Sequence, residues 1–154
     1  MAILNHPTGW NQSGFTFVAD PSSNLQVILA EGPRVDALCL PLETYGTVNC
    51  QNGPIVALNA DRWRLGGDDW DSTLDAYRTY LINHEVGHLV GLRHPIERCP
   101  TVDKISAAME PQTNNLNGCR GNGIPLAWEI EWARNRPAVV GPDPSWDGPR
   151  PTWP

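Results

Sequence analysis

Alternation of hydrophobic and polar residues marks the first part of the chain and predicts short β-strands. Aromatic and small residues alternate with Thr16 and Val18 over 15–19, and an apolar run over 25–30 is bounded by polar turn residues. Two more strands are expected at 44–50 and 54–59, because the Asn-Gly pair between them readily supplies the positive φ angles of a tight turn. We therefore expect a small sheet whose last two strands are antiparallel.

A helical period replaces the alternation after residue 71. The stretch 61–71 is predicted to be a loop, and Ser72 is the expected N-cap, with Asp75 three positions later completing a pair that resembles a capping box. Gly91 is expected to end the helix, since glycine readily adopts the left-handed conformation. One face of this helix carries five residues at helical spacing, namely Leu74, Tyr77, Leu81, His84 and His88.

The second half of the chain shows little periodicity. Proline, cysteine, asparagine and glycine are frequent over 95–124, which predicts an irregular segment. Pro125 suits the first turn of a second helix that continues to about Asn135. The remaining residues, 137–154, form a proline-rich tail that we expect to lack a fold.

Length and charge limit the classes of protein that fit. The 154 residues suffice for one domain, which we place at 1–136, with an upper subdomain at 1–91 and a lower subdomain at 92–136. No apolar run approaches the length of about 18 residues that spans a bilayer. The net charge is -6, and the eleven Lys and Arg residues are scattered, so we expect neither a membrane span nor nucleic-acid binding.

Four cysteines, Cys39, Cys50, Cys99 and Cys119, contain no C-x-x-C pair, so the usual spacing of a cysteine-based zinc site is absent. Disulfides are the favoured interpretation. Of the three connectivities, pairing neighbours in sequence is the simplest because each bond closes a short loop. Disulfides imply an oxidising, extracytoplasmic location. Four reduced thiols in a cytosolic protein remain the alternative.

The segment 84–94 carries the pattern of a zinc hydrolase. Its residues fit H-E-x-x-H-x-x-G-x-x-H at every fixed position. His84 and His88 lie one helical turn apart, so both imidazoles can reach one metal ion at about 2.0–2.1 Å. Gly91 turns the chain so that His94 returns to the same ion from a loop.

Three neutral nitrogen ligands leave one coordination position for water, which is typical of a catalytic zinc site. Zinc lowers the pKa of that water towards about 7, and Glu85 could accept its proton and deliver it to a leaving amine. These residues predict hydrolysis of an amide bond. The alternative is a buried helix that carries histidines by chance, which would match on the order of once in 10⁵ such chains.

With His94 included, the chain resembles the metzincin clan of zinc endopeptidases. That clan has a methionine-containing turn beneath the metal, and Met109 follows His94 at a suitable distance within 106–111. The resemblance implies that Met109 forms a hydrophobic floor and does not bind zinc. An ordinary core methionine is the alternative.

A closer resemblance is to an uncharacterised actinobacterial family of metzincin-like peptidases, and it covers roughly residues 3–124. The cysteine positions of that family also look similar, which favours the disulfides. The similar segments are Leu4-Asn5-His6-Pro7 with Gly9-Trp10, 58–63, 77–80, 83–88, Met109, Gln112-Thr113 and Asn117-Gly118-Cys119.

Two departures from the metzincin pattern affect the expected fold and site. A first strand and a long backing helix normally precede the region that 4–10 resembles, whereas three residues precede it here, so we expect a truncated start or a smaller sheet. No tyrosine follows Met109 closely, although some metzincin families place a switchable tyrosine there. The resemblance also implies that the strand at 44–50 forms the sheet edge that pairs with an extended substrate, with an ordinary hairpin strand as the alternative.

The combined expectation is an α+β fold in which a small mixed sheet packs on the active-site helix above an irregular lower subdomain. The predicted function is a secreted, monomeric endopeptidase with one Zn²⁺ ion and a protein or peptide substrate. A catalytically inert, zinc-stabilised extracellular binding module on the same scaffold is the alternative.

Two weaker signals lie outside the zinc pattern. Asp68, Asp69 and Asp71 could bind calcium, although acids at a helix start are favoured by the helix dipole alone. Trp146 and Trp153 could dock a partner from a polyproline-like segment, and a solvated terminus is the competing interpretation.

Overall fold

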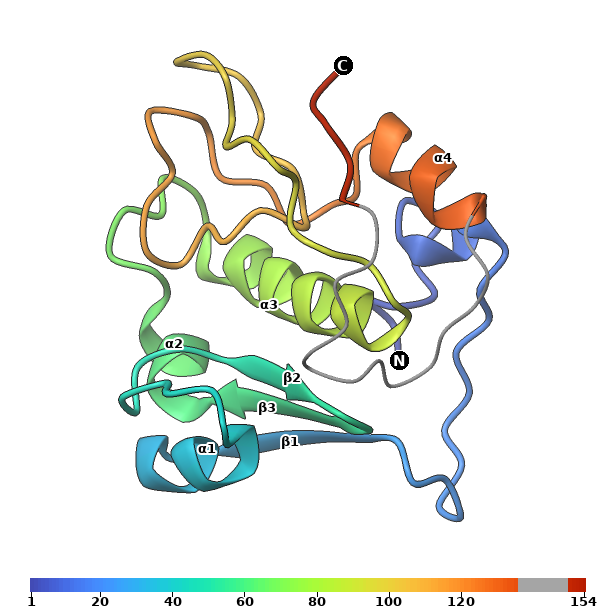
Figure 1. Cartoon of the computed structure of the whole chain (residues 1–154), viewed down its shortest axis with the longest axis vertical. Helices are drawn as coiled ribbons and strands as arrows, with labels where there is room; N and C mark the ends of the chain where they lie inside the picture. Colours follow the sequence, from blue (N-terminus) through green and yellow to red (C-terminus); the bar gives the residue numbers. More distant parts are fainter. Residues whose placement is uncertain (136–149) are drawn as a thin grey trace.

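The computed structural model describes residues 1–135 and 150–154, which form an α+β domain with one three-stranded sheet and four α-helices (Figure 1). This confirms the expected fold class. The strands are β1 Gln26–Ala30, β2 Cys50–Asn52 and β3 Ile55–Asn59. The helices are the 3₁₀-helix η1 Trp10–Ser13 and the α-helices α1 Gly32–Cys39, α2 Ala60–Leu65, α3 Leu74–Leu89 and α4 Ala127–Arg134.

The sheet is mixed, with the strand order β1-β3-β2. β1 runs parallel to β3, while β2 is antiparallel to β3 and pairs Gln51 with Val56. The antiparallel hairpin is therefore confirmed. Its turn lies slightly later than predicted, because Asn52 still pairs with Ile55 and the positive φ of 55° falls on Gly53.

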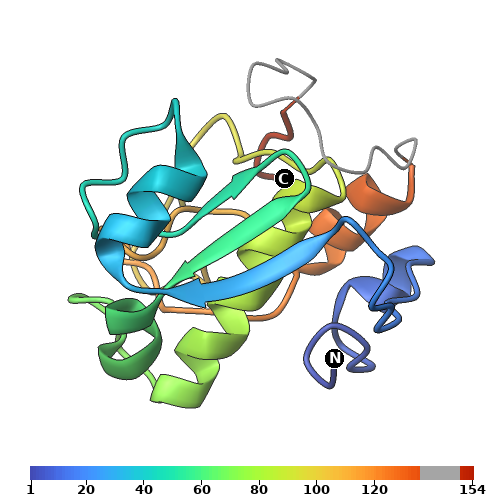
Figure 2. The same ribbon diagram turned by 90° about the horizontal axis from the view of Figure 1, so that it is seen from below.

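Helices cover both faces of β3. Its side chains alternate in direction, so its apolar residues point to both faces and pack against a helix on each side. Val56 and Leu58 are buried in a cluster with residues of α3, whereas Ala57 is buried in another with Val35 of α1. Figure 2 shows the sheet from below with α1 and α3 on opposite sides. A disulfide between Cys39 and Cys50 ties α1 to β2 within the second cluster.

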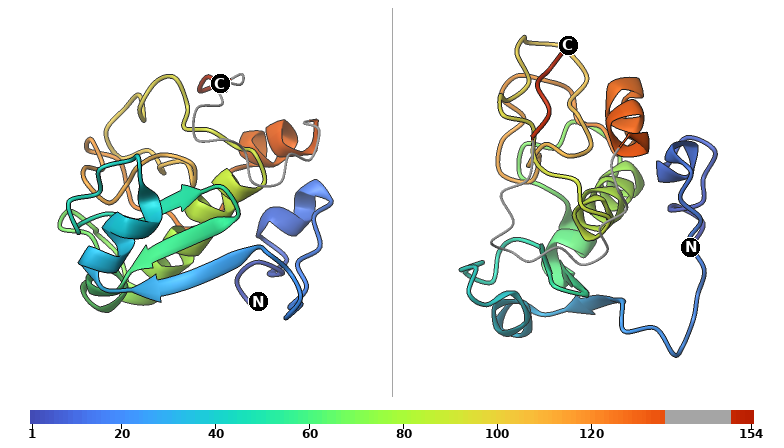
Figure 3. Two further views of the ribbon diagram at one scale, coloured as in Figure 1. Left: turned by 60° about the horizontal axis from the view of Figure 1, so that its bottom comes forward. Right: turned by 45° about the vertical axis from the view of Figure 1, so that its right-hand side comes forward.

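A third cluster lies on the far side of α3 from the sheet and joins the N-terminal segment to α4. Trp10 of η1 is fully buried, and its Nε1 donates a hydrogen bond of 2.8 Å to the carbonyl of Asn83 on α3. Met109 and Ile130 pack in the same cluster, the latter from α4. Figure 3 shows α4 and the N-terminal segment side by side. α3 is therefore the central element of the fold.

The expected strand at 15–19 is wrong, since the chain is extended there without a neighbouring strand. The Asn5 side chain takes the partner's place: its Nδ2 donates to the Phe17 carbonyl at 2.7 Å, and its Oδ1 accepts from the Phe17 amide at 3.1 Å. Phe15 and Phe17 pack against buried residues of the third cluster. The alternation in this segment therefore reflects packing against a core and not a sheet.

The expected strand at 44–50 is also wrong over most of its length. Tyr45 and Gly46 adopt left-handed conformations, with φ of 52° and 64°, so the chain turns where a strand was predicted. The Asp36 carboxylate of α1 holds this turn by accepting the Gly46 amide at 2.7 Å and the Thr44 hydroxyl. Strand pairing begins only at Cys50.

Two helices, α1 and α2, were not predicted from the sequence. Pro33 lies in the first turn of α1, where proline is well tolerated. The Asn59 side chain caps α2 by accepting two backbone amides, so a helix occupies the first part of the expected loop 61–71. α3 begins close to the prediction, with Thr73 in place of Ser72 as its N-cap.

The irregular segment and the following helix agree with the expectation. The Cys99–Cys119 disulfide cross-links the segment, and α4 ends near the predicted Asn135. Both disulfides therefore have the predicted connectivity, which is compatible with an extracellular protein. No helix among the described residues is long and apolar enough to cross a bilayer.

The tail divides into two segments. Residues 136–149, with Trp146, lie outside the described residues. Residues 150–154 have no helix or strand, but they pack on the domain, since the Ile96 amide donates to the Pro151 carbonyl at 2.9 Å. Trp153 packs against Trp128 of α4, with 5.4 Å between ring centroids and the rings tilted by 54°, and so differs from the expected solvated terminus.

α3 ends in a Schellman motif. Gly91 has a φ of 90°, its amide donates to the His88 carbonyl at 2.9 Å, and the Leu92 amide donates to the Gly87 carbonyl at 2.9 Å. These two bonds satisfy carbonyl groups at the helix end that have no partner within the helix. Gly91 therefore ends the helix as predicted, and it sets the direction of the chain that leads to His94.

Replacing Gly91 should affect both the stability of the protein and its affinity for a metal ion, whereas replacing a similar glycine far from the histidines should affect stability alone. Gly91→Ala is expected to lower the free energy of unfolding by about 1–2 kcal/mol, because alanine is strained in the left-handed region. It should also weaken any binding of a metal ion at the predicted histidine ligands, since His94 follows the turn. Gly14→Ala is the matched control: Gly14 has a φ of 93°, and an added Cβ would contact nothing within 4 Å. Urea denaturation and chelator competition measure both effects, and zinc affinity equal to wild type in Gly91→Ala would contradict the role of this turn.

Candidate metal centre

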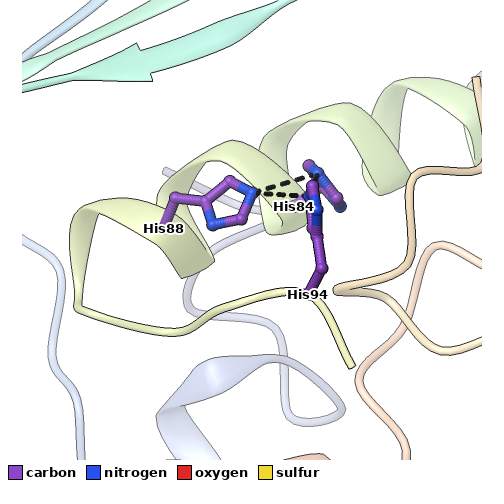
Figure 4. A group of neighbouring side chains, drawn as sticks. All are labelled: His84, His88 and His94. Atoms are coloured by element: carbon purple, nitrogen blue, oxygen red, sulfur yellow. Dashed lines mark hydrogen bonds between the residues drawn. The ribbon is translucent and has the colours of Figure 1, made fainter. Parts of the chain in front are cut away.

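Three histidine side chains converge beside α3. His84 and His88 come from successive turns of the helix, and His94 returns from the loop that follows Gly91 (Figure 4). Their Nε2 atoms lie 3.1 Å apart between His88 and His94, and 3.2 Å apart in the other two pairs. The structure thus brings together the three residues that the sequence pattern selected.

Backbone carbonyls determine the tautomer of two of these rings. His84 Nδ1 lies 2.8 Å from the Ala108 carbonyl, and His88 Nδ1 lies 2.9 Å from the Leu92 carbonyl. A carbonyl oxygen only accepts, so both Nδ1 atoms carry the proton and both Nε2 atoms present a lone pair. Lone pairs that face one another at this distance repel, and a cation at their centre removes the repulsion.

The cluster fits a tetrahedral metal ion. Ligands about 2.0–2.1 Å from such an ion are about 3.3–3.4 Å apart, close to the observed separations. Burial lowers the pKa of His84 to about 3 and that of His88 to about 4, with the neighbouring His88 adding to the effect on His84. Burial likewise holds the pKa of His94 well below its usual value. The rings are therefore neutral near pH 7, the form that binds metals.

Met109 lies directly against the helix that carries the histidines. It occupies a turn in which the Glu110 amide donates to the Ala107 carbonyl at 3.0 Å, and its side chain has no exposed surface. A Cβ on Gly87 would lie 2.3 Å from the Met109 sulfur, so a larger residue there would displace the methionine. The contact explains why glycine stands between the two helical histidines.

A buried carboxylate, not identified from the sequence, holds this turn in place. Glu129 of α4 is fully buried and accepts the amides of Ala108 at 3.0 Å, Met109 at 2.8 Å and Leu126 at 2.8 Å. Burial raises its pKa to about 7, and the three amides oppose that rise. The Ala108 carbonyl accepts a hydrogen bond from His84. By holding the Ala108 amide, Glu129 therefore supports a candidate metal ligand indirectly. The one signal in the sequence was an acid in the first turn of the predicted helix.

Glu85 lines the same cavity as the three histidines, which has a volume of about 520 Å³. Its side chain is buried, and burial raises its pKa to about 8. Among the described residues no hydrogen bond to its carboxylate is found, so the group is available to a molecule in the cavity. The geometry thus combines a nitrogen donor set with a carboxyl group of perturbed pKa, as at many catalytic sites.

The opposite wall of the cavity is the edge of the sheet. Three residues of β2, Cys50, Gln51 and Asn52, line it, together with Val48 and Asn49 just before the strand. The sheet edge that was expected at 44–50 is therefore formed by β2, which begins at Cys50 and ends at Asn52, two residues beyond the end of the expected strand.

A tyrosine reaches the cavity from α3, although none follows Met109. Tyr80 lines the cavity, but its hydroxyl is held by donating to the Glu110 carbonyl at 3.1 Å and accepting the Gln112 amide at 2.8 Å. Burial raises its pKa. Tyr80 is therefore fixed in position, unlike the switchable tyrosine of some metzincins.

The three aspartates considered for calcium do not form a cluster. Asp68 pairs with Arg62 at 3.1 Å, and Asp71 accepts the Gly121 amide at 2.8 Å. Within 1–135 and 150–154, the three histidines form the one group of potential ligands close enough to share an ion.

The sequence of the chain matches a known protein family. The family model described as "Protein of unknown function (DUF3152)" matches residues 1–129. The chain belongs to the DUF3152 family. The match includes the histidines, Glu85, Met109 and all four cysteines, and it ends at Glu129. No curated protein and no solved structure matches the chain. The chemistry of this DUF3152 protein must therefore be inferred from its own residues.

The raised pKa of Glu85 predicts a pH dependence of the metal-free protein. The folded chain keeps the Glu85 proton up to about pH 8, whereas the unfolded chain loses it near its usual 4.5. Between these values unfolding releases a proton, so the contribution of Glu85 to stability is complete below 4.5 and is lost as the pH rises to 8. The free energy of unfolding should fall by about 1.4 kcal/mol per pH unit relative to Glu85→Gln. Urea titrations of the chelated proteins between about pH 5.5 and 8 test this, and parallel curves would contradict it.

Replacing Glu129 should loosen the turn beneath the histidines. Glu129→Gln replaces one of the two carboxylate oxygens, which together accept three backbone amides, with an NH₂ group that cannot accept, so it should lower the free energy of unfolding by about 1–3 kcal/mol. Zinc affinity should fall about 10- to 100-fold, as for other groups that support a ligand. Glu131→Gln, on the exposed face of the same helix and paired with Arg134 at 2.8 Å, is the matched control. Equal zinc affinity in the two variants, measured by chelator competition, would argue against the support role.

Proposed function

We propose that the protein is a zinc-dependent endopeptidase of the metzincin type that hydrolyses peptide bonds of proteins or peptides outside the cytoplasm. The observation that carries this proposal is the convergence of three imidazole Nε2 atoms with Glu85 in one cavity. A structural zinc site is closed by four protein ligands, whereas three ligands beside a cavity leave a position for a reactant.

Zinc is the metal that best fits this donor set. Three neutral nitrogen ligands at tetrahedral spacing are typical of catalytic zinc sites, although imidazoles also bind copper, iron and nickel. When bound, zinc supplies a Lewis acid that polarises a carbonyl and lowers the pKa of water.

Glu85 is the general base and then the general acid of the proposed reaction. Its carboxylate accepts a proton from the attacking water and delivers that proton to the nitrogen of the departing amine. Burial raises the pKa of Glu85 to about 8 in the absence of zinc, so water is largely excluded from around this carboxyl group. In such surroundings a cation held by the three histidines would stabilise the ionised carboxylate of Glu85.

The edge strand β2 suits a substrate in extended conformation. It forms one wall of the cavity, and its outer edge is not covered by another strand of the described chain. A peptide that pairs with such an edge gains main-chain hydrogen bonds, which give affinity without a strict sequence requirement. This favours a protein or peptide substrate over a small amide.

Two further observations support the metzincin type and the location. Met109 packs under the histidines, and the neighbouring Ala108 carbonyl orients His84, as a methionine-containing turn would require. The two disulfides favour an oxidising compartment.

Cleavage of a peptide library by the purified chain with one equivalent of zinc tests the proposal. Glu85→Gln should still bind zinc but should lose cleavage by at least about 10²-fold, since it cannot transfer the proton. His94→Ala should lose zinc affinity as well as cleavage. If the wild-type chain holds zinc and cleaves nothing that Glu85→Gln leaves intact, the protein is the zinc-stabilised binding module and not a peptidase.

A further inference from the structure

A positively charged side chain of the C-terminal segment, that of Arg150, lies at the cavity. Arg150 lines it, and its Nε donates to the carbonyl of the ligand His94 at 3.0 Å. Its Nη2 donates to the Pro95 carbonyl at 2.7 Å. Two of the five N–H groups of the guanidinium are thus used on backbone carbonyls, and neither acceptor carries a formal charge.

The position of Arg150 is fixed by its neighbours on both sides. The Pro151 carbonyl accepts the Ile96 amide at 2.9 Å, which joins the tail to the ligand loop. Three residues after Arg150, the Trp153 ring packs at a tilt against Trp128 of α4. A guanidinium held in this way loses little conformational freedom when it binds an anion, so more of the interaction energy is available as affinity.

The charges at the cavity differ from those of the molecule as a whole. The chain carries a net charge of -6, yet among the described residues that line the cavity Glu85 is the one carboxylate. None of the ion pairs formed within 1–135 and 150–154 involves Arg150. The guanidinium of Arg150 therefore lines the cavity without forming an ion pair with a carboxylate of the described chain.

From this arrangement we propose that the cavity binds a carboxylate of the substrate at Arg150, next to the scissile bond. The planar guanidinium matches a carboxylate with two parallel hydrogen bonds, which a neutral side chain cannot provide. The carboxylate can belong to an acidic side chain or to the C-terminus of a peptide. This inference rests on the proposed peptidase function, and it adds a substrate class to that function.

Two short peptide hydroxamates test the inference on the zinc-loaded protein without relying on turnover. Both carry a C-terminal amide and differ by Glu or Gln beside the hydroxamate, and calorimetry measures their affinities. The Glu probe is expected to bind about tenfold more tightly than the Gln probe, as a charge-assisted hydrogen bond allows. Arg150→Gln should abolish this difference, whereas Arg150→Lys should keep a fraction of it.

Arg134→Gln is the control, because Arg134 is an exposed arginine of α4 outside the cavity lining. A third probe, with Gln beside the hydroxamate and a free C-terminal carboxylate, distinguishes the two sources of the anion. Equal binding of all three probes overturns the carboxylate site while hydroxamate binding upholds the metal centre. Failure of every probe to bind zinc-loaded protein overturns the peptidase proposal and the carboxylate site together.

Discussion

The hydrogen bond from His84 Nδ1 to the Ala108 carbonyl links the two halves of the site. It sets the direction of the Nε2 lone pair, and it ties α3 to the turn that contains Met109. Glu129 holds the same turn from α4 through two amides, so a ligand, a turn and a distant helix share one network. A ligand bond of about 2 Å would tolerate little displacement, which explains why buried hydrogen bonds hold this turn from both α3 and α4.

Features that depend on local sequence were predictable. The spacing of His84 and His88 on one helix face and the left-handed Gly91 follow from rules that act within a few residues. The disulfides join cysteines 11 and 20 positions apart, and their pairing follows from the lower entropic cost of closing short loops. The hairpin before α2 was also predicted from a local turn signal, although its turn residues are Gly53 and Pro54 and not the Asn-Gly pair. The metal-binding cluster was therefore accessible from the sequence, and its catalytic role stays a prediction.

Features that depend on distant partners were not predictable. The segment at 15–19 has the alternation of a strand, but Asn5 occupies its backbone groups and a core receives its phenylalanines. The turn at 44–50 exists because Asp36, on a helix that was itself missed, accepts its amide and hydroxyl groups. Glu129 and Arg150 likewise gain their roles from residues 20 or more positions away. In each case a long-range polar contact overrides the local pattern.

The two disulfides lie on opposite sides of the cavity. Cys39–Cys50 joins α1 to the edge strand, and Cys99–Cys119 closes a loop in the irregular segment, so neither bond crosses from the sheet to the irregular segment. Since these pairs use all four cysteines, the width of the cavity is limited by hydrogen bonds and packing around α3 and not by a covalent cross-link. Each disulfide therefore stabilises the shape of one part of the fold, and no disulfide fixes the separation of the sheet edge from the irregular segment.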